Sequence, residues 1–116
     1  MSVKKPKISV LIPVHNGADT LAETVASILN QTFADFELLL FDDASTDASP
    51  EIINSFADSR IRRFRSDANL GISEARNRLM ELAEGEYLAV MDHDDLSAPR
   101  RLEKQAAWLD NNPEVA

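Results

Sequence analysis

Three carboxylates lie within four positions late in the chain, at Asp92, Asp94 and Asp95. They directly follow an apolar run, residues 87–91, which predicts a buried strand. In an extended chain residues i and i+2 point the same way, so we expect Asp92 and Asp94 to share a face and His93 to point to the other. Two carboxylates that close favour a hard divalent metal bound through oxygen. A polar loop that caps the following helix explains the same residues equally well.

The rest of the chain predicts the elements that position this acidic segment. Apolar runs predict strands at 8–14, 36–41, 61–64 and 87–91, and helical spacing predicts helices at about 19–30, 50–56, 72–84 and 99–112. This alternation is typical of a three-layer α/β/α fold with a mainly parallel, Rossmann-like sheet. Arginines at positions 60, 62, 63 and 65 favour an edge position for the third strand.

The helix ends are also predicted from residue type. We expect Asp19 or Thr20 to cap the first helix, Gly85 to end the third and Pro99 to begin the fourth.

Polar residues gather where each predicted strand ends. They are His15 and Asn16, Asp42 and Asp43, Asp67 and Asn69, and the segment 92–95. Turns and helix starts favour the same residue types, so one cluster alone indicates little. Open parallel sheets bind ligands at the carboxyl ends of their strands, and four clusters at one edge therefore favour a binding site.

Composition limits the partners. The 116 residues fit one domain, carry a formal net charge of −8 and include no cysteine. The negative charge argues against nucleic-acid binding, and the lack of cysteine excludes thiolate chemistry. A divalent metal would still let an acidic protein hold a phosphate-bearing ligand, with Mg²⁺ or Mn²⁺ favoured over zinc by an oxygen-rich site.

Several phosphate-binding classes are disfavoured. The first strand is followed by residues 15–19, HNGAD, which lack the G-x-G-x-x-G fingerprint, and the chain has no P-loop. Asp92-His93-Asp94 suggests an aspartyl-phosphate phosphatase, but Asp95 and Leu96 follow where that motif usually has Thr or Val.

Four blocks of sequence, in their order and spacing, resemble the family 2 inverting glycosyltransferases. They are residues 9–16 (SVLIPVHN), 41–47 (FDDASTD), 69–77 (NLGISEARN) and 91–95 (MDHDD). The resemblance covers residues 7–113 and implies a GT-A fold. It implies that residues 1–116 are a single domain, the nucleotide-sugar-binding half of a hexosyltransferase-like enzyme, truncated at its C-terminal end and inactive alone.

The resemblance also implies roles for individual residues. Asp43 would bind the nucleobase, and Asp92 would lie at the ribose and share the metal with Asp94. The implied nucleotide-sugar site comprises Pro13, Val14, His15, Asn16, Asp42, Asp43, Asn69, Gly71, Arg76, Asp92 and His93, and the implied metal ligands of Mg²⁺ or Mn²⁺ are Asp94 and Asp92.

Two interpretations remain for each of Arg76, His15 and Asp95. Arg76 either lies near the nucleotide or pairs with a nearby glutamate on the helix surface. His15 either stacks on the base or is a turn residue, and Asp95 either caps the following helix or supports the site. His93 occupies a position that varies in the family, which disfavours a direct role.

The implied reaction is direct displacement at the anomeric carbon by an acceptor hydroxyl, with a nucleoside diphosphate leaving. We expect a UDP-sugar donor, a saccharide, lipid-linked or protein acceptor, and a catalytic base downstream of Ala116 rather than in this chain. We expect a cytoplasmic protein, either free or peripheral to the membrane. The alternatives are a non-catalytic nucleotide- or partner-binding module and, less favoured, a metal-dependent phosphohydrolase.

Overall fold

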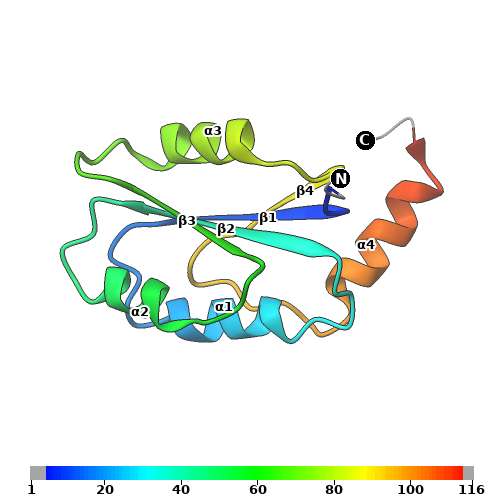
Figure 1. The fold of residues 1–116 in the computed structure, drawn as a ribbon, viewed down its shortest axis with the longest axis horizontal. Coiled ribbons are helices and arrows are strands. Elements are labelled where there is room, and N and C mark those ends of the chain that lie inside the picture. Colours follow the sequence, from blue (N-terminus) through cyan, green and yellow to red (C-terminus); the bar gives the residue numbers. More distant parts are fainter. Residues whose placement is uncertain (1–4, 114–116) are drawn as a thin grey trace.

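A computed structural model describes residues 5–113, in which one parallel sheet lies between two layers of helices (Figure 1). The strands are β1 (Ile8–Val14), β2 (Phe36–Asp43), β3 (Ile61–Ser66) and β4 (Tyr87–Val90), and the helices are α1 (Leu21–Leu29), α2 (Ser49–Ser55), α3 (Ile72–Leu82) and α4 (Arg101–Asp110). The ends of the predicted domain, residues 1–4 and 114–116, lie outside the described residues. None of the helices within 5–113 has the length and apolar character needed to cross a membrane.

The strand order is β3-β2-β1-β4, and all three neighbouring pairs are parallel. In Figure 1, α1 and α2 cover one face of the sheet and α3 covers the other. The connection through α3 returns past β2 and β1 to bring β4 beside β1. The winding therefore reverses between β1 and β4, which is the point where open α/β sheets bind ligands. The predicted α/β fold, with β3 at one edge, is confirmed.

The core is divided between the two faces by strand alternation. The even-numbered residues of β1, from Ile8 to Val14, belong to the cluster that includes α1 and α2. On the other face Leu11, Leu39 and Phe41 pack with Ala75 and Leu79 of α3. Both faces of the central strands are covered, which explains their continuous apolar runs.

Three strand ends differ from the prediction, and the smallest difference is in β4, which ends at Val90 and not at Met91. Asp42 and Asp43 were expected in a loop after the second strand, but they are the last two residues of β2. Their backbones pair with Arg65 and Ser66, which also extends β3 beyond the predicted residue 64. The polar side chains at these positions predicted a loop, whereas the strand pairing depends on backbone hydrogen bonds.

Of the three predicted helix ends, Thr20 is confirmed as the residue at the N-cap of α1, and the other two predictions are wrong. Thr20 precedes α1, but its side chain makes no capping hydrogen bond. α3 ends at Leu82, three residues before Gly85, and α4 begins at Arg101 rather than Pro99. Gly85 is required for another reason: a Cβ there would lie 2.5 Å from Ser9 Oγ on the neighbouring β1.

Candidate functional site

A pocket of about 280 Å³ lies at the carboxyl ends of β1 and β2, next to the start of α3. Its walls are Pro13, Val14, His15, Asp43, Asn69, Gly71, Ile72, Ala75 and His93. Seven of the eleven predicted nucleotide-sugar residues are thus brought together, and the other four, Asn16, Asp42, Arg76 and Asp92, do not line it. The sequence reasoning missed Ile72 and Ala75. Both residues follow the predicted Asn69-x-Gly71 turn closely, and this position could have indicated that they line the pocket.

Asp43 is the buried carboxylate of this pocket, with a relative exposure of 3%. Its Oδ1 accepts the backbone N–H of Leu70 at 2.7 Å, and its Oδ2 accepts that of Gly71 at 2.9 Å. Gly71 has a φ of 88°, a conformation that favours glycine. A carboxylate has about four lone-pair sites, so Asp43 can accept further hydrogen bonds from a ligand.

Asp42 lies on the opposite face of β2, because neighbouring strand residues alternate. It is 2% exposed, and its oxygens accept the backbone N–H of Ser45 at 3.1 Å and Nη1 of Arg65 at 3.0 Å. This side chain joins the loop after β2 to the edge strand β3. The structure does not bring Asp42 to the pocket.

His15 and Asn16 connect the loops after β1 and β2. The Nδ1 of His15 lies 2.6 Å from the carbonyl oxygen of Asp43, so Nδ1 carries the proton and donates it. Asn16 has a φ of 51°, its backbone N–H donates to Ser45 Oγ at 3.0 Å, and its Oδ1 accepts the N–H of Thr46 at 2.8 Å. Asn16 therefore holds the rim of the pocket in place.

Asp47 and Ser49 extend this connection, and the sequence reasoning missed both. The backbone N–H of Gly17 donates to Ser49 Oγ at 2.9 Å, and that of Ala18 donates to Asp47 Oδ2 at 3.0 Å. Hydrogen bonds from the Ser49 side chain and from the backbone N–H groups of Ser49 and Ala18 lower the pKa of Asp47. The signal was Asp47 placed two residues before Ser49-Pro50, where an aspartate commonly bonds to nearby backbone N–H groups.

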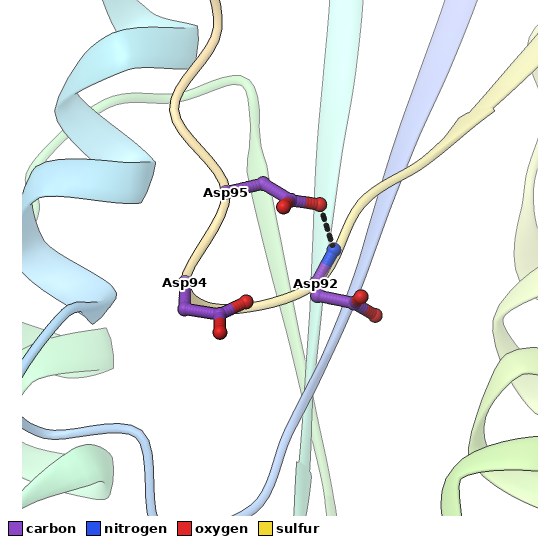
Figure 2. Close-up of side chains that lie close together, drawn as sticks. All are labelled: Asp92, Asp94 and Asp95. Atoms are coloured by element: carbon purple, nitrogen blue, oxygen red, sulfur yellow. Dashed lines mark hydrogen bonds between the residues drawn. The ribbon is translucent and has the colours of Figure 1, made fainter.

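The acidic segment forms a turn (Figure 2). The N–H of Asp95 donates to the Asp92 carbonyl at 3.1 Å, and Asp95 Oδ2 accepts the N–H of Asp92 at 2.9 Å. One oxygen from each of Asp92, Asp94 and Asp95 lies within 4.8 Å of the others. The expectation of an extended chain here is wrong, but the turn brings the carboxylates together. Asp95 closes this turn and does not cap α4, which begins six residues later.

His93 connects the acidic turn to α1 and to the pocket. Its carbonyl oxygen accepts hydrogen bonds from Oγ1 of Thr20 at 2.9 Å and from Oγ1 of Thr24 at 2.8 Å. Its ring packs against Gly17, where an added Cβ would lie 2.7 Å from the His93 Cγ and Nδ1. Thr24 is fully buried on α1, as are Leu21 and Val25. A polar residue within this apolar stripe was the sequence signal for a buried hydrogen bond, and the sequence analysis missed it.

Arg76 of α3 reaches the acidic turn. Its Nη2 lies 2.8 Å from Asp92 Oδ1. The predicted alternative, pairing with a glutamate on the helix surface, is instead the role of Arg78, whose Nε lies 3.2 Å from Glu74 Oε1. Together the turn and the pocket offer oxygen ligands for a hard cation beside a concave surface with a buried acceptor.

Comparison with known proteins identifies relatives of this chain. The family model described as glycosyl transferase family 2 matches residues 9–116. Among curated proteins, EpsE of Bacillus subtilis is 42% identical over 110 residues, which span 92% of this chain and 40% of EpsE. The chain thus spans about two fifths of the length of EpsE and of two other curated relatives.

Solved structures also share the fold. The crystal structure of residues 1–349 of Staphylococcus aureus TarS in complex with UDP aligns with a TM-score of 0.85 and 29% identity, covering 90% of this chain and 32% of that one. The mannosyltransferase PcManGT from Pyrobaculum calidifontis, solved with GDP-Man and Mn²⁺, aligns with a TM-score of 0.82 and 26% identity, covering 91% of this chain and 33% of that one.

Proposed function

The chain belongs to glycosyl transferase family 2, and we propose that it forms the donor-binding half of an inverting transferase. This half would hold a nucleoside diphosphate sugar while an acceptor hydroxyl displaces the nucleotide at the anomeric carbon. The observation that carries the proposal is the position of His93, which lines the pocket and also belongs to the acidic turn. A nucleoside in the pocket would therefore have its diphosphate beside the carboxylates.

The nucleoside would be recognised chiefly through Asp43. Its carboxylate is fixed by the N–H groups of Leu70 and Gly71 and keeps lone pairs for the N–H donors of a base. A base held by hydrogen bonds on one side would contact the apolar surface of Pro13 and Ala75 on the pocket wall. We propose uridine as the nucleoside, which the UDP bound to TarS supports, although PcManGT was solved with a guanosine nucleotide.

The acidic turn fits a divalent metal by the chemistry of its donors. Three exposed or half-exposed carboxylates with oxygens within 4.8 Å of one another offer only hard oxygen ligands, which suit Mg²⁺ or Mn²⁺. We propose Asp94 and Asp92 as ligands, with Asp95 holding the turn. A bound metal would neutralise the charge that develops on the leaving diphosphate. The Mn²⁺ in PcManGT supports this assignment.

The remaining chemistry would come from elsewhere in the protein. The carboxylates described above are either bound to backbone groups or assigned to the metal, so we propose that none of them removes the acceptor proton. A separate general base would be needed within hydrogen-bond reach of the acceptor hydroxyl. The chain described here would bind and orient the donor.

Titration calorimetry with UDP, in the presence and absence of Mn²⁺, tests the proposal. The wild-type chain should bind UDP more tightly with Mn²⁺ than without it, and Asp94→Asn should lose this enhancement. Asp67→Asn is the matched control, because Asp67 is fully exposed and outside the pocket. Equal binding by wild type and Asp94→Asn, or no binding of UDP by wild type, would contradict the proposal.

A further inference from the structure

Asp92 is the one carboxylate of the acidic turn that the structure joins to a cation. Nη2 of Arg76 lies 2.8 Å from its Oδ1, and the two side chains are 38% and 47% exposed. Arg76 lies on α3 and Asp92 follows β4, so the ion pair connects two elements that border the site. A metal bound to Asp92 would therefore share this carboxylate with the guanidinium of Arg76.

The guanidinium is incompletely satisfied in this arrangement. Its contact with Asp92 uses one nitrogen, although an arginine and a carboxylate often form two parallel hydrogen bonds. The Nε of Arg76 is buried and has no hydrogen-bond partner among the described residues. A buried donor without a partner is unfavourable, so a ligand with several acceptor oxygens could satisfy Arg76 better than Asp92 alone does.

We propose that Arg76 is an internal counter-ion that competes with the metal for Asp92 until a phosphate-bearing ligand gives it a new partner. The inference rests on the proposed function, since it takes the turn as the metal site. A divalent cation beside the guanidinium is repelled by it, which weakens metal binding to the empty site. Diphosphate oxygens would relieve that repulsion. Arg76 therefore makes the binding of metal and of nucleotide mutually dependent, each raising the affinity of the other by the same factor.

Arg78 provides an internal comparison. It lies on the same helix, half a turn further on, and its side chain is 52% exposed. Its partner is Glu74, an ordinary i,i+4 surface pair on α3, and neither residue lines the pocket. Removing its charge changes the net charge of the chain as much as removing that of Arg76, so the two variants separate a local effect from a general electrostatic one.

The test is calorimetric titration of MnCl₂ into the wild-type chain, Arg76→Met and Arg78→Met, with and without saturating UDP. We expect Arg76→Met to bind Mn²⁺ alone about two- to fivefold more tightly than wild type, because an exposed or half-exposed ion pair is of modest strength. The enhancement of Mn²⁺ binding by UDP should shrink by at least the same factor. Arg78→Met should behave as wild type, and Arg76→Lys, which keeps the charge, should bind Mn²⁺ alone nearly as weakly as wild type.

The outcomes separate the two proposals. If wild type binds Mn²⁺ and UDP with mutual enhancement, but Arg76→Met binds Mn²⁺ alone no more tightly, the counter-ion role is overturned and the donor-binding function stands. If Arg78→Met gains as much affinity as Arg76→Met, the effect is one of net charge, and the role of Arg76 is again overturned. If wild type binds neither ligand, both proposals fail.

Discussion

Asp43 fixes Gly71: at the end of β2 its Oδ2 accepts the Gly71 N–H at 2.9 Å, just before α3 begins. Its other oxygen accepts the N–H of Leu70. The carboxylate therefore sets the conformation of the turn that forms one wall of the pocket, and it is also the acceptor proposed for the nucleobase. Structure and binding depend here on the same side chain.

Replacing Asp43 by Asn should lower both the stability of the protein and its affinity for UDP. The amide has one oxygen where two acceptors are used, so one backbone N–H would face an NH₂ group, and we expect a loss of about 1–3 kcal/mol in the free energy of unfolding. We expect UDP affinity to fall at least about tenfold, since each 1.4 kcal/mol corresponds to that factor. Denaturant unfolding and calorimetry measure the two effects.

Asp42→Asn is the matched variant one residue away. Asp42 is equally buried but bonds to Ser45 and Arg65 on the other face of the strand. It should lose a similar amount of stability, while the folded protein keeps UDP affinity close to wild type. A larger loss of UDP affinity in Asp42→Asn than in Asp43→Asn would show that the pocket is assigned to the wrong face.

Gly17→Ala should disturb the acidic turn from a distance. The added Cβ would lie 2.7 Å from the ring of His93, which must then move together with the turn that it belongs to. We expect weaker Mn²⁺ binding in the presence of UDP. His93→Ala combined with Gly17→Ala should restore part of the affinity, because most of the clash is with the ring. If the double variant binds no better than Gly17→Ala, the clash does not act through His93.

Glu37→Gln should change how stability depends on pH. Burial raises the pKa of Glu37, but hydrogen bonds from Ser9, from the Glu84 N–H and from Arg62 together outweigh it and lower that pKa. The stabilisation is therefore present above the unfolded-state pKa, about 4.3, and is lost as pH falls towards the lower folded-state value.

Urea unfolding at about pH 7 and at about pH 3 measures the pH dependence of the free energy of unfolding. The two conditions lie on either side of the unfolded-state pKa of Glu37. The free energy of unfolding of wild type should fall on acidification. That of Glu37→Gln should be about 1.5–3 kcal/mol lower than wild type at neutral pH, and it should fall less on acidification. Glu51→Gln, at an exposed position on α2, is the control and should follow wild type. Parallel curves for wild type and Glu37→Gln would contradict the assigned shift.

The fold was predictable because the strands and helices follow from local patterns. The runs at residues 8–14 and 36–41 are apolar at nearly every position, which is typical of strands in a sheet covered on both faces. The site was located by the rule that polar residues at carboxyl strand ends lie together, and the pocket at His15, Asp43 and Asn69 follows that rule.

What could not be predicted depends on contacts between distant parts of the sequence. The start of α4 is one case: Oε1 of Gln31 accepts the N–H of Leu102 at 3.0 Å, 71 positions away, and its Nε2 donates to the Ala98 carbonyl at 2.7 Å. A cap supplied from another element leaves no local signal, and the sequence therefore pointed to Pro99. The hydrogen bonds of Thr20 and Thr24 to His93 are a second case.

We propose that UDP and a metal bind together at the carboxyl ends of β1, β2 and β4. The most direct measurement is an amide NMR titration of the ¹⁵N-labelled chain, first with UDP and Mg²⁺ and then with trace Mn²⁺ in place of Mg²⁺. UDP should shift the amides of His15, Leu70 and Gly71, and Mn²⁺ should broaden those of residues 92–95 first. A second pocket, of about 550 Å³, is lined by Leu88 of β4 and Trp108 of α4 among other residues, and shifts confined to it would contradict the account.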